Sequence, residues 1–401
     1  MIVQMTPESG AHFEPTPPST AAIKPAPVSM IQKPQVMVIV RWPVGGIRTY
    51  IRYILSHPDF QAYRYLLVAP DRQEVHDLVT ELDRDIELVA TQDSTASIAN
   101  TVARLLFSRP VDLVHSHGFS SGLAAALSAR LRGVPHLMTS HDVLQPSQFQ
   151  GIRGQLKKQA LAFNFRLIDC IQSVGHEAQA NLESMLSLAD KKLTTVVNGV
   201  DVQRFANALP RDIRAEQNIA SDQLVIGFMG RFMAQKGFIH LVRAIEQLHT
   251  SGQSVPTVVA VGSGDFIRED TALIQQKGLL DYFRFIPFES DVGGLLKGID
   301  LLVMPSLWEA CPLLPMEAMA AGIPVLGTTC VGLNEVLEQT PNKRLPPADV
   351  DALVAALRQY SEPAVLADWQ QQARGYQPEA LQRFDIHRTA EAVAALYQRW
   401  L

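Results

Sequence analysis

Cysteine is scarce and unpatterned in this sequence of 401 residues. Its three cysteines, Cys170, Cys311 and Cys330, show no CxxC spacing. This argues against a disulfide framework and indicates free thiols in a reducing compartment. Long hydrophobic runs are lacking too, since no apolar run reaches the ~18–20 residues that span a bilayer. The N-terminus also lacks the basic-then-apolar order of a signal peptide. We therefore expect a cytoplasmic protein.

An excess of positive charge is also missing. The formal net charge is −5, which argues against a nucleic-acid partner. Hydrophobic residues make up 47% and charged residues 19% of the chain, as is usual for a globular protein. A chain of 401 residues is too long for one ordinary core, so we expect two domains of roughly 150–200 residues each.

Residues 1–34 differ from the rest of the chain. They are rich in Pro, Ser, Thr and Ala and show no hydrophobic periodicity. Such a segment cannot bury enough apolar surface to offset its ordering entropy, so we predict a disordered tail. We place the first domain at 35–205 and the second at 206–401.

From Gln35 onward, short apolar strands alternate with amphipathic helices. The strands include VMVIV, YLLVA and VDLVHSH, and the pattern restarts with LVIGFMGR, TVVAVGSGD and DLLVMPS. Continuous apolar strands separated by helices are typical of parallel sheets covered on both faces. The sequence therefore predicts an α/β fold with two doubly wound sheets, in which the last helix could pack back on the first domain.

Ligands of such sheets bind beyond the carboxyl ends of the strands, so polar residues and glycines at these ends are candidates for a binding site. In the first half, Gly45 and Gly46 stand at a helix entry, where free amides favour an anion. An ordinary turn explains them equally well. His117 and His141 follow two strands and could bond sugar hydroxyls, whereas we interpret His115 as a core histidine.

In the second half, cations and carboxylates follow the strands. Arg231 and Lys236 come after the first strand and suit a pyrophosphate, although they could be a solvated pair at a helix start. Gly264 lies in a GxG turn after the second strand, which is a weak signal. Glu309 and Glu317 follow DLLVMPS, the first on a loop and the second in what we predict to be the first turn of a helix.

The start of that helix offers further contacts. The free amides near Leu313 and Leu314 can point at phosphate. Glu317 could chelate vicinal hydroxyls, as on a ribose. Complementation of the helix dipole would explain Glu317 but not Glu309.

Four segments, taken in order, resemble the retaining GT-B glycosyltransferases of family 4 (group 1 type). They are VGGIRTYI, VVNGVDVQRF, GRFMAQKG and EACPLLPMEAMAAGIPV with its Glu-x7-Glu spacing. The resemblance covers Gln35 to Leu401. It implies two Rossmann-like domains that face each other across a cleft. The N-terminal domain would bind the acceptor and the C-terminal domain the nucleotide sugar.

The resemblance also implies roles for single residues. Arg231 and Lys236 would neutralise the donor pyrophosphate, with Gly45, Gly46, Gly264 and the amides of Leu313 and Leu314 around it. Glu317 would hold the donor ribose, while Glu309 and His141 would contact the transferred sugar. His117 and Asn198 would line the acceptor side of the cleft.

The implied reaction moves a hexose from a UDP- or GDP-sugar to a glycan or lipid-linked acceptor with retention at the anomeric carbon. Two side-chain cations neutralise the leaving group, so no cofactor and no metal are expected. Cell-surface polysaccharide or lipopolysaccharide biosynthesis is the expected setting. Two alternatives stay open: a nucleotide-sugar 2-epimerase and a nucleotide-sugar-binding protein without turnover.

Residues 151–166, GIRGQLKKQALAFNFR, contain four cations and no acid. Leu156, Leu161, Phe163 and Phe165 are interleaved with them. A basic amphipathic helix can lie on an anionic membrane, which would bring the protein to the inner face of the plasma membrane. A solvated basic face over core packing is an equally good interpretation.

Overall fold

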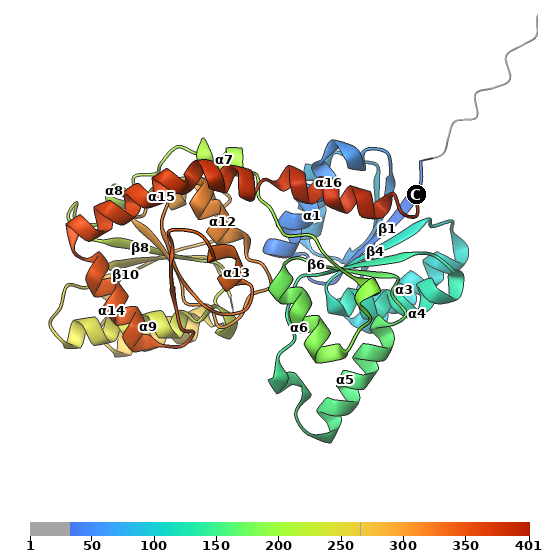
Figure 1. Cartoon of the computed structure of the whole chain (residues 1–401), viewed down its shortest axis with the longest axis horizontal. Helices are drawn as coiled ribbons and strands as arrows, with labels where there is room; N and C mark the ends of the chain where they lie inside the picture. The colour runs from blue at the N-terminus through green and yellow to red at the C-terminus, as the bar shows by residue number, and fades with distance from the viewer. Residues whose placement is uncertain (1–32, 265) are drawn as a thin grey trace, which may run out of the picture. The chain divides into compact units, whose positions relative to one another are not determined.

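Two parallel sheets organise the chain in a computed structural model that describes residues 33–264 and 266–401 (Figure 1). The predicted tail lies outside these residues, save for residues 33 and 34. The first sheet has the order β3-β2-β1-β4-β5-β6-β7 and the second the order β10-β9-β8-β11-β12-β13. The predicted α/β fold class, with two Rossmann-like sheets, is confirmed.

The first sheet belongs to the N-terminal half of the chain. Its strands are β1 (Gln35–Val40), β2 (Arg64–Pro70), β3 (Ile86–Thr91), β4 (Leu113–His117), β5 (His136–Ser140), β6 (Cys170–Ser173) and β7 (Leu193–Thr195). The helices between them are α1 (Gly46–Ser56), α2 (Gln73–Leu82), α3 (Thr95–Ser108), α4 (Phe119–Arg132), α5 (Gly151–Phe165) and α6 (His176–Leu186), with short 3-10 turns η1 (Pro58–Phe60), η2 (Pro146–Phe149) and η3 (Asp190–Lys192).

The second sheet lies in the C-terminal half. Its strands are β8 (Val225–Met229), β9 (Thr257–Val261), β10 (Phe283–Ile286), β11 (Leu301–Met304), β12 (Val325–Thr328) and β13 (Lys343–Leu345). The helices of this half of the chain are α7 (Val202–Ala206), α8 (Ile213–Glu216), α9 (Phe238–Thr250), α10 (Ile267–Gln276), α11 (Val292–Lys297), α12 (Leu313–Ala320), α13 (Leu333–Leu337), α14 (Val350–Tyr360), α15 (Pro363–Arg383) and α16 (Ile386–Tyr397), with 3-10 turns η4 (Ala234–Lys236) and η5 (Leu280–Tyr282).

Alternate residues of the central strands enter different cores, which explains why the strands are apolar throughout. In β1, Val36 and Val38 join one buried cluster, whereas Met37 joins another on the opposite face. In β8, Val225 and Ile226 divide in the same way. Side chains of a strand point alternately to its two faces, so a sheet covered by helices on both faces needs apolar residues at every position.

The last helix packs on the first half of the chain. Helix α16 lies along α1 and η1 (Figure 1), and its residues Val393 and Tyr397 belong to the same buried cluster as Tyr50 of α1. A backbone bridge between Val200 and Asp385 ties the segment before α16 to the chain just after the first sheet.

Several elements, β13 and α15 among them, have no counterpart among the predicted ones. Strand β13 has only three residues, Lys343–Leu345, and forms an edge of the second sheet. Helix α15 has 21 residues and includes Pro378. No helix within the described residues is long and apolar enough to cross a membrane. Cys170, Cys311 and Cys330 are buried and free.

Candidate functional site

Several of the candidate residues follow the strands at which each sheet reverses its order. In the first sheet, β1 and β4 are neighbours, so Gly45–Gly46 and His117 follow adjacent strands. In the second sheet, β8 and β11 are neighbours, so Lys236 and Glu309 do likewise. Ligands of doubly wound sheets bind at such switch points.

The half-buried Lys236 and the buried Glu309 form an ion pair. Lys236 Nζ donates to both carboxylate oxygens of Glu309, at 2.8 and 3.0 Å. Glu309 is 5% exposed and also accepts from the Ser306 hydroxyl at 2.8 Å. From sequence we expected these two side chains on different parts of one ligand. The structure brings them together, so a bound diphosphate would share the ammonium group with Glu309.

A glycine allows this approach. Gly237 follows η4 with φ of 66°, and a Cβ there would lie 2.0 Å from the carbonyl oxygen of Pro305, just after β11. Only glycine fits such a position without moving the backbone. The loop after β8 therefore touches the loop after β11, which sets the reach of Lys236.

Arg231 is the more accessible of the two cations. It is exposed, and its guanidinium donates a hydrogen bond to the sulfur of Met233 at 3.4 Å. Its charge is therefore available to a ligand at the end of β8, in contrast to that of Lys236.

Glu317 is a buried carboxylate without a partner. It is 9% exposed, and its side chain makes no hydrogen bond or ion pair with any residue that the structure describes, whereas its backbone carbonyl accepts from the Ala321 amide. Burial raises its pKa from 4.5 to about 7, and Arg204 and Arg52 oppose this shift. A buried polar group normally finds a partner in the protein or in a ligand.

The predicted position of Glu317 within its helix was wrong. Helix α12 begins at Leu313, so Glu317 is its fifth residue and the first turn carries no acid. The two prolines Pro312 and Pro315 made the start of the helix hard to predict. Pro312 is the N-cap, so the helix begins directly after it and includes Pro315. Dipole complementation in the first turn therefore does not explain Glu317.

The backbone amides at the amino end of α12 can donate hydrogen bonds to an anionic group. Its N-cap is Pro312, and no side chain caps it. The half-buried residues Leu313 and Leu314 supply its first two amides. Free amides at a helix start, together with the helix dipole, attract an anion.

The glycine loop after β1 resembles that helix start. Gly45 is the N-cap of α1 with φ of 56°, and no side chain caps the helix. A Cβ at Gly45 or Gly46 would meet no atom within 4 Å, so both face open space. The positive φ requires glycine at position 45, and the open space lets a ligand approach the backbone.

Gly264 has a structural reason of its own. Its φ is 155°, and a Cβ there would lie 2.4 Å from the carbonyl oxygen of Phe232. Glycine lets the loop after β9 pack against the loop after β8. This close approach accounts for the residue without a ligand.

His141 and His117 bond each other. His117 Nδ1 and His141 Nε2 are 3.1 Å apart, and the ring of Tyr50 meets the His141 ring edge-on with centroids 4.8 Å apart. Burial lowers the pKa of His141 to about 3 and that of His117 well below its usual value. Both rings are therefore neutral near pH 7, and each can offer its other nitrogen to a hydroxyl group.

His115 is a satisfied core histidine, in line with its interpretation from sequence. It is 1% exposed and bonds the Tyr397 hydroxyl and the Thr139 hydroxyl, each at 2.7 Å. Tyr397 belongs to α16, so the last helix closes this network beneath His117.

Asn198 contacts the loop between the two glutamates. It is 7% exposed, and its Nδ2 donates to the carbonyl of Cys311 at 2.8 Å. Its Oδ1 is buried and has no hydrogen-bond partner among the residues that the structure describes. The structure thus places Asn198 against the backbone of the Glu309–Glu317 segment.

Sequence reasoning missed a second contact between loops of the two sheets. Glu335 in the first turn of α13 accepts from the amides of His176 and Glu177 at 2.9 and 2.8 Å, so it caps α6. Glu177 in turn accepts from the Gly332 amide and from Asn334 at the start of α13. No local pattern could reveal this pair, because its partners are more than 150 residues apart in sequence.

Sequence reasoning also missed Tyr53, whose buried hydroxyl has no hydrogen-bond partner within the described part of the chain. Burial and then Glu317 raise its pKa, which places the two side chains close together.

Among the described residues, no group of three or more His, Cys, Asp or Glu side chains could hold a metal ion. That no cofactor is needed stays a prediction.

Family models match most of the chain. Residues 44–204 match the model described as Glycosyltransferase Family 4. Residues 211–375 match the model described as Glycosyl transferases group 1. The first match covers strands β2 to β7 and the second covers strands β8 to β13.

Curated relatives are glycosyltransferases as well. A 2-deoxystreptamine glucosyltransferase of Streptomyces kanamyceticus is 29% identical over 73% of this chain and 78% of its own length. An Escherichia coli enzyme, UDP-Gal:alpha-D-GlcNAc-diphosphoundecaprenol alpha-1,3-galactosyltransferase, is 25% identical over 80% of this chain and 82% of its own.

Solved structures share the fold. Anabaena Alr3699/HepE in complex with UDP-glucose superimposes with a TM-score of 0.79 at 19% identity, covering 91% of this chain and 99% of its own. The lipopolysaccharide-biosynthesis glycosyltransferase WaaG superimposes with a TM-score of 0.71 at 18% identity, covering 90% and 99%.

Proposed function

The chain belongs to the GT-B glycosyltransferases of family 4, group 1 type, and on this basis we propose its donor, stereochemistry and setting. It transfers a hexose from a UDP- or GDP-sugar to a glycan or lipid-linked acceptor. The anomeric configuration is retained, and the product serves cell-surface polysaccharide or lipopolysaccharide assembly. The two curated relatives, a glucosyltransferase and a galactosyltransferase named for UDP-Gal, support a hexose and a UDP donor.

The observation that carries this proposal is the buried, unpartnered carboxylate of Glu317. Burying a carboxylate without partners is unfavourable, so its retention needs a reason. Two vicinal ribose hydroxyls would supply two hydrogen bonds and satisfy the group. Helix α12 would then present Glu317 to the ribose and its first amides to the diphosphate.

We propose that fixed positive charges stabilise the leaving group. Arg231, Lys236 and the amides of Leu313 and Leu314 would stabilise the diphosphate as its charge develops. Preorganised donors aimed at developing charge are usually the largest catalytic contribution. With this charge supplied by the chain, the reaction requires neither a metal nor a cofactor.

The same proposal places the transferred sugar between Glu309 and His141. The neutral imidazole of His141 can donate to or accept from a sugar hydroxyl. Retention follows from displacement on the front face of the sugar. In that step the acceptor oxygen bonds the anomeric carbon as the diphosphate oxygen leaves, and the departing oxygen accepts the acceptor's proton.

Thermal shift with UDP, GDP, ADP and their common sugars tests the donor site. We expect one nucleotide series to stabilise the parent, by about 2.7 kcal/mol at 100 times Kd. Glu317→Gln should abolish the shift. Glu379→Gln, an exposed glutamate on α15, is the matched control and should keep it. No shift with any nucleotide in the parent would refute the proposal.

Product analysis then separates the three candidate activities. The stabilising nucleotide sugar is incubated with an acceptor panel and followed by NMR. A glycoside whose anomeric configuration equals that of the donor supports a retaining transferase. Inversion would overturn the stereochemical part. A 2-epimer identifies an epimerase, and an unchanged donor identifies a binding protein.

We also propose that α5 contacts anionic membrane. The apolar residues of α5 fall into two groups. Leu161 and Phe165 are buried in the core. Ile152, Leu156 and Phe163 are 82%, 61% and 61% exposed. Offsets of four and seven residues put these three on one stripe of the helix. The helix has no acidic residue.

Flotation with anionic and neutral vesicles tests this contact. We expect binding to anionic vesicles only, weakened by on the order of 10- to 100-fold in Lys157→Glu/Lys158→Glu. Phe163→Ser should weaken it as well. Leu209→Ser is the control, since Leu209 is 84% exposed outside α5. Equal binding by the lysine variant and the parent would exclude a membrane role for α5.

A further inference from the structure

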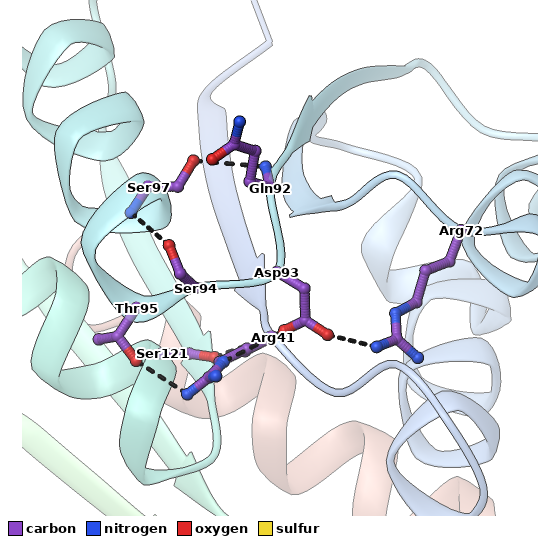
Figure 2. A network of polar contacts seen from close by, with 8 residues as sticks. All are labelled: Arg41, Arg72, Gln92, Asp93, Ser94, Thr95, Ser97 and Ser121. Atoms are coloured by element: carbon purple, nitrogen blue, oxygen red, sulfur yellow. Dashed lines mark hydrogen bonds and ion pairs between the residues drawn. The ribbon is translucent and has the colours of Figure 1, made fainter.

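A cluster of one tryptophan, two arginines and one aspartate lies at the carboxyl edge of the first sheet and has no part in the proposed function so far. Arg41 follows β1, Arg72 comes two residues after β2, and Asp93 comes two residues after β3. Figure 2 shows the two arginines directed at Asp93 from either side. We call Arg41, Trp42, Arg72 and Asp93 the Trp42 cluster.

The Trp42 cluster carries an excess positive charge. Asp93 accepts from Arg41 Nε at 3.3 Å and from Arg72 Nη2. One carboxylate between two guanidinium groups leaves a net charge of +1. Arg72 Nε and Nη1 make no hydrogen bond with the residues that the structure describes, so each retains a free N–H. A planar guanidinium with free N–H groups binds phosphate or carboxylate well.

Arg41 is held in place before any ligand arrives. Its backbone amide donates to the Ser121 hydroxyl at 3.0 Å, and its Nη1 donates to the Thr95 hydroxyl at 2.9 Å (Figure 2). Ser94 in turn caps α3 by accepting from the Ser97 amide. A preorganised cation loses less conformational entropy when it binds a ligand.

Trp42 adds an apolar surface beside the charges. It is 43% exposed, and the guanidinium carbons of Arg41 and Arg72 lie 4.9 and 5.4 Å from its ring centroid. Core packing does not explain an indole ring left this open. An exposed aromatic ring can instead lie against the apolar face of a sugar ring, as large aromatic side chains do at many binding surfaces.

The position of the Trp42 cluster relates it to the donor site. Trp42 precedes Gly45 by three residues, in the loop between β1 and α1. That loop follows the strand at the switch point of the first sheet. A sugar resting on Trp42 would therefore lie beside the loop proposed to meet the donor diphosphate.

We propose that the Trp42 cluster is an acceptor subsite for a sugar that carries an anionic group, either a phosphate or a carboxylate. This inference rests on the proposed function. The guanidinium groups of Arg72 and Arg41 take the anion, and the indole ring takes the apolar face of the sugar. The acceptor of this glycosyltransferase is thereby an acidic saccharide.

A purely structural cluster would behave differently. If the arginines only tied three loops together, their loss would lower the melting temperature and leave ligand selectivity unchanged. The test is therefore a comparison of acidic with neutral sugars on variants that stay folded. The partly exposed ion pair of Arg72 and Asp93 makes a small contribution to stability, so Arg72→Gln should fold.

Ligand-observed NMR titration in saturating UDP provides that comparison. The probes are glucose, glucose 6-phosphate, glucuronate and inorganic phosphate. We expect glucose 6-phosphate or glucuronate to bind more tightly than glucose and than phosphate alone. Arg72→Gln should weaken the acidic sugar about tenfold. Trp42→Ala should weaken it too, and Trp42→Phe should restore it.

The control is Arg109→Gln, which removes an exposed arginine paired with Glu87 in the same half of the chain. It should bind like the parent. Preference for glucose 6-phosphate assigns a phosphate to the acceptor, and preference for glucuronate assigns a carboxylate. Equal binding of acidic and neutral sugars, or equal binding by parent and Arg72→Gln, would overturn the proposal. Stabilisation by UDP is measured separately, so failure here leaves the donor site intact.

Discussion

Replacement of Glu317 by Gln should reverse part of the pH dependence of stability. Burial raises the pKa of Glu317 from 4.5 to about 7. Between these values the folded chain keeps a proton that the unfolded chain releases, so the free energy of unfolding falls as pH rises. One pKa unit is 1.36 kcal/mol, so the ionised group destabilises the fold by roughly 3 kcal/mol above pH 7. Glutamine does not ionise, so the Glu317→Gln variant does not lose this free energy of unfolding as pH rises.

Urea denaturation at pH 5 and pH 8 measures the effect. We expect Glu317→Gln to gain roughly 2–3 kcal/mol relative to the parent between these two pH values. Glu379→Gln, on the exposed face of α15, should follow the parent. Parallel curves for the parent and Glu317→Gln would refute the buried, unpartnered state of this carboxylate.

The same ionisation should act on the donor in the opposite direction. Ribose hydroxyls donate to the ionised carboxylate, so nucleotide affinity should rise as pH increases through 7. With a pKa of about 7, only about a tenth of the sites are ionised at pH 6, and the apparent Kd there should be about tenfold higher than at pH 8. A flat affinity profile in isothermal titration would show that Glu317 does not hold the donor.

Three further predictions follow from the contacts of the site. Lys236→Met leaves Glu309 buried without its cation, so the free energy of unfolding should fall by about 3–5 kcal/mol, and adding Glu309→Gln should recover most of it in urea titrations. Arg231→Gln should stay within about 0.5 kcal/mol of the parent, since its side chain is exposed, yet weaken UDP about tenfold and leave uridine unchanged in calorimetry. Glu335→Ala removes two bonds to amides at the start of α6 and should lower the free energy of unfolding by about 1–2 kcal/mol, whereas equal stability would show that the cap contributes nothing.

The sheets could be predicted from sequence because their signal is local. Strands β1, β8 and β11 are continuous apolar runs, and each is covered on both faces by helices. Strand β13 gives no such signal, since Lys343–Leu345 is short, partly charged and at an edge. Helix α15 was not predicted for a similar reason. It contains Pro378 and is largely polar, so it shows no clear helical periodicity.

Within the candidate site, sequence supplied the residue types and their order along the chain. Arg231, Lys236, Glu309 and Glu317 could be singled out because each follows a strand end, where ligands of parallel sheets bind. The free backbone amides at the starts of α1 and α12 could be predicted from the glycines and prolines at these helix starts. Such features depend on a few neighbouring residues only.

Tertiary structure alone decided which of these groups meet. Lys236 bonds Glu309 because β8 and β11 are neighbours, which a linear pattern does not state. Glu317 lacks a partner because of what surrounds α12, and its pKa follows from that burial. His115 is satisfied by Tyr397, which lies 282 residues away. Charge, periodicity and turn chemistry are local properties of a chain, whereas burial and pairing depend on strand order, and so only the folded molecule determines them.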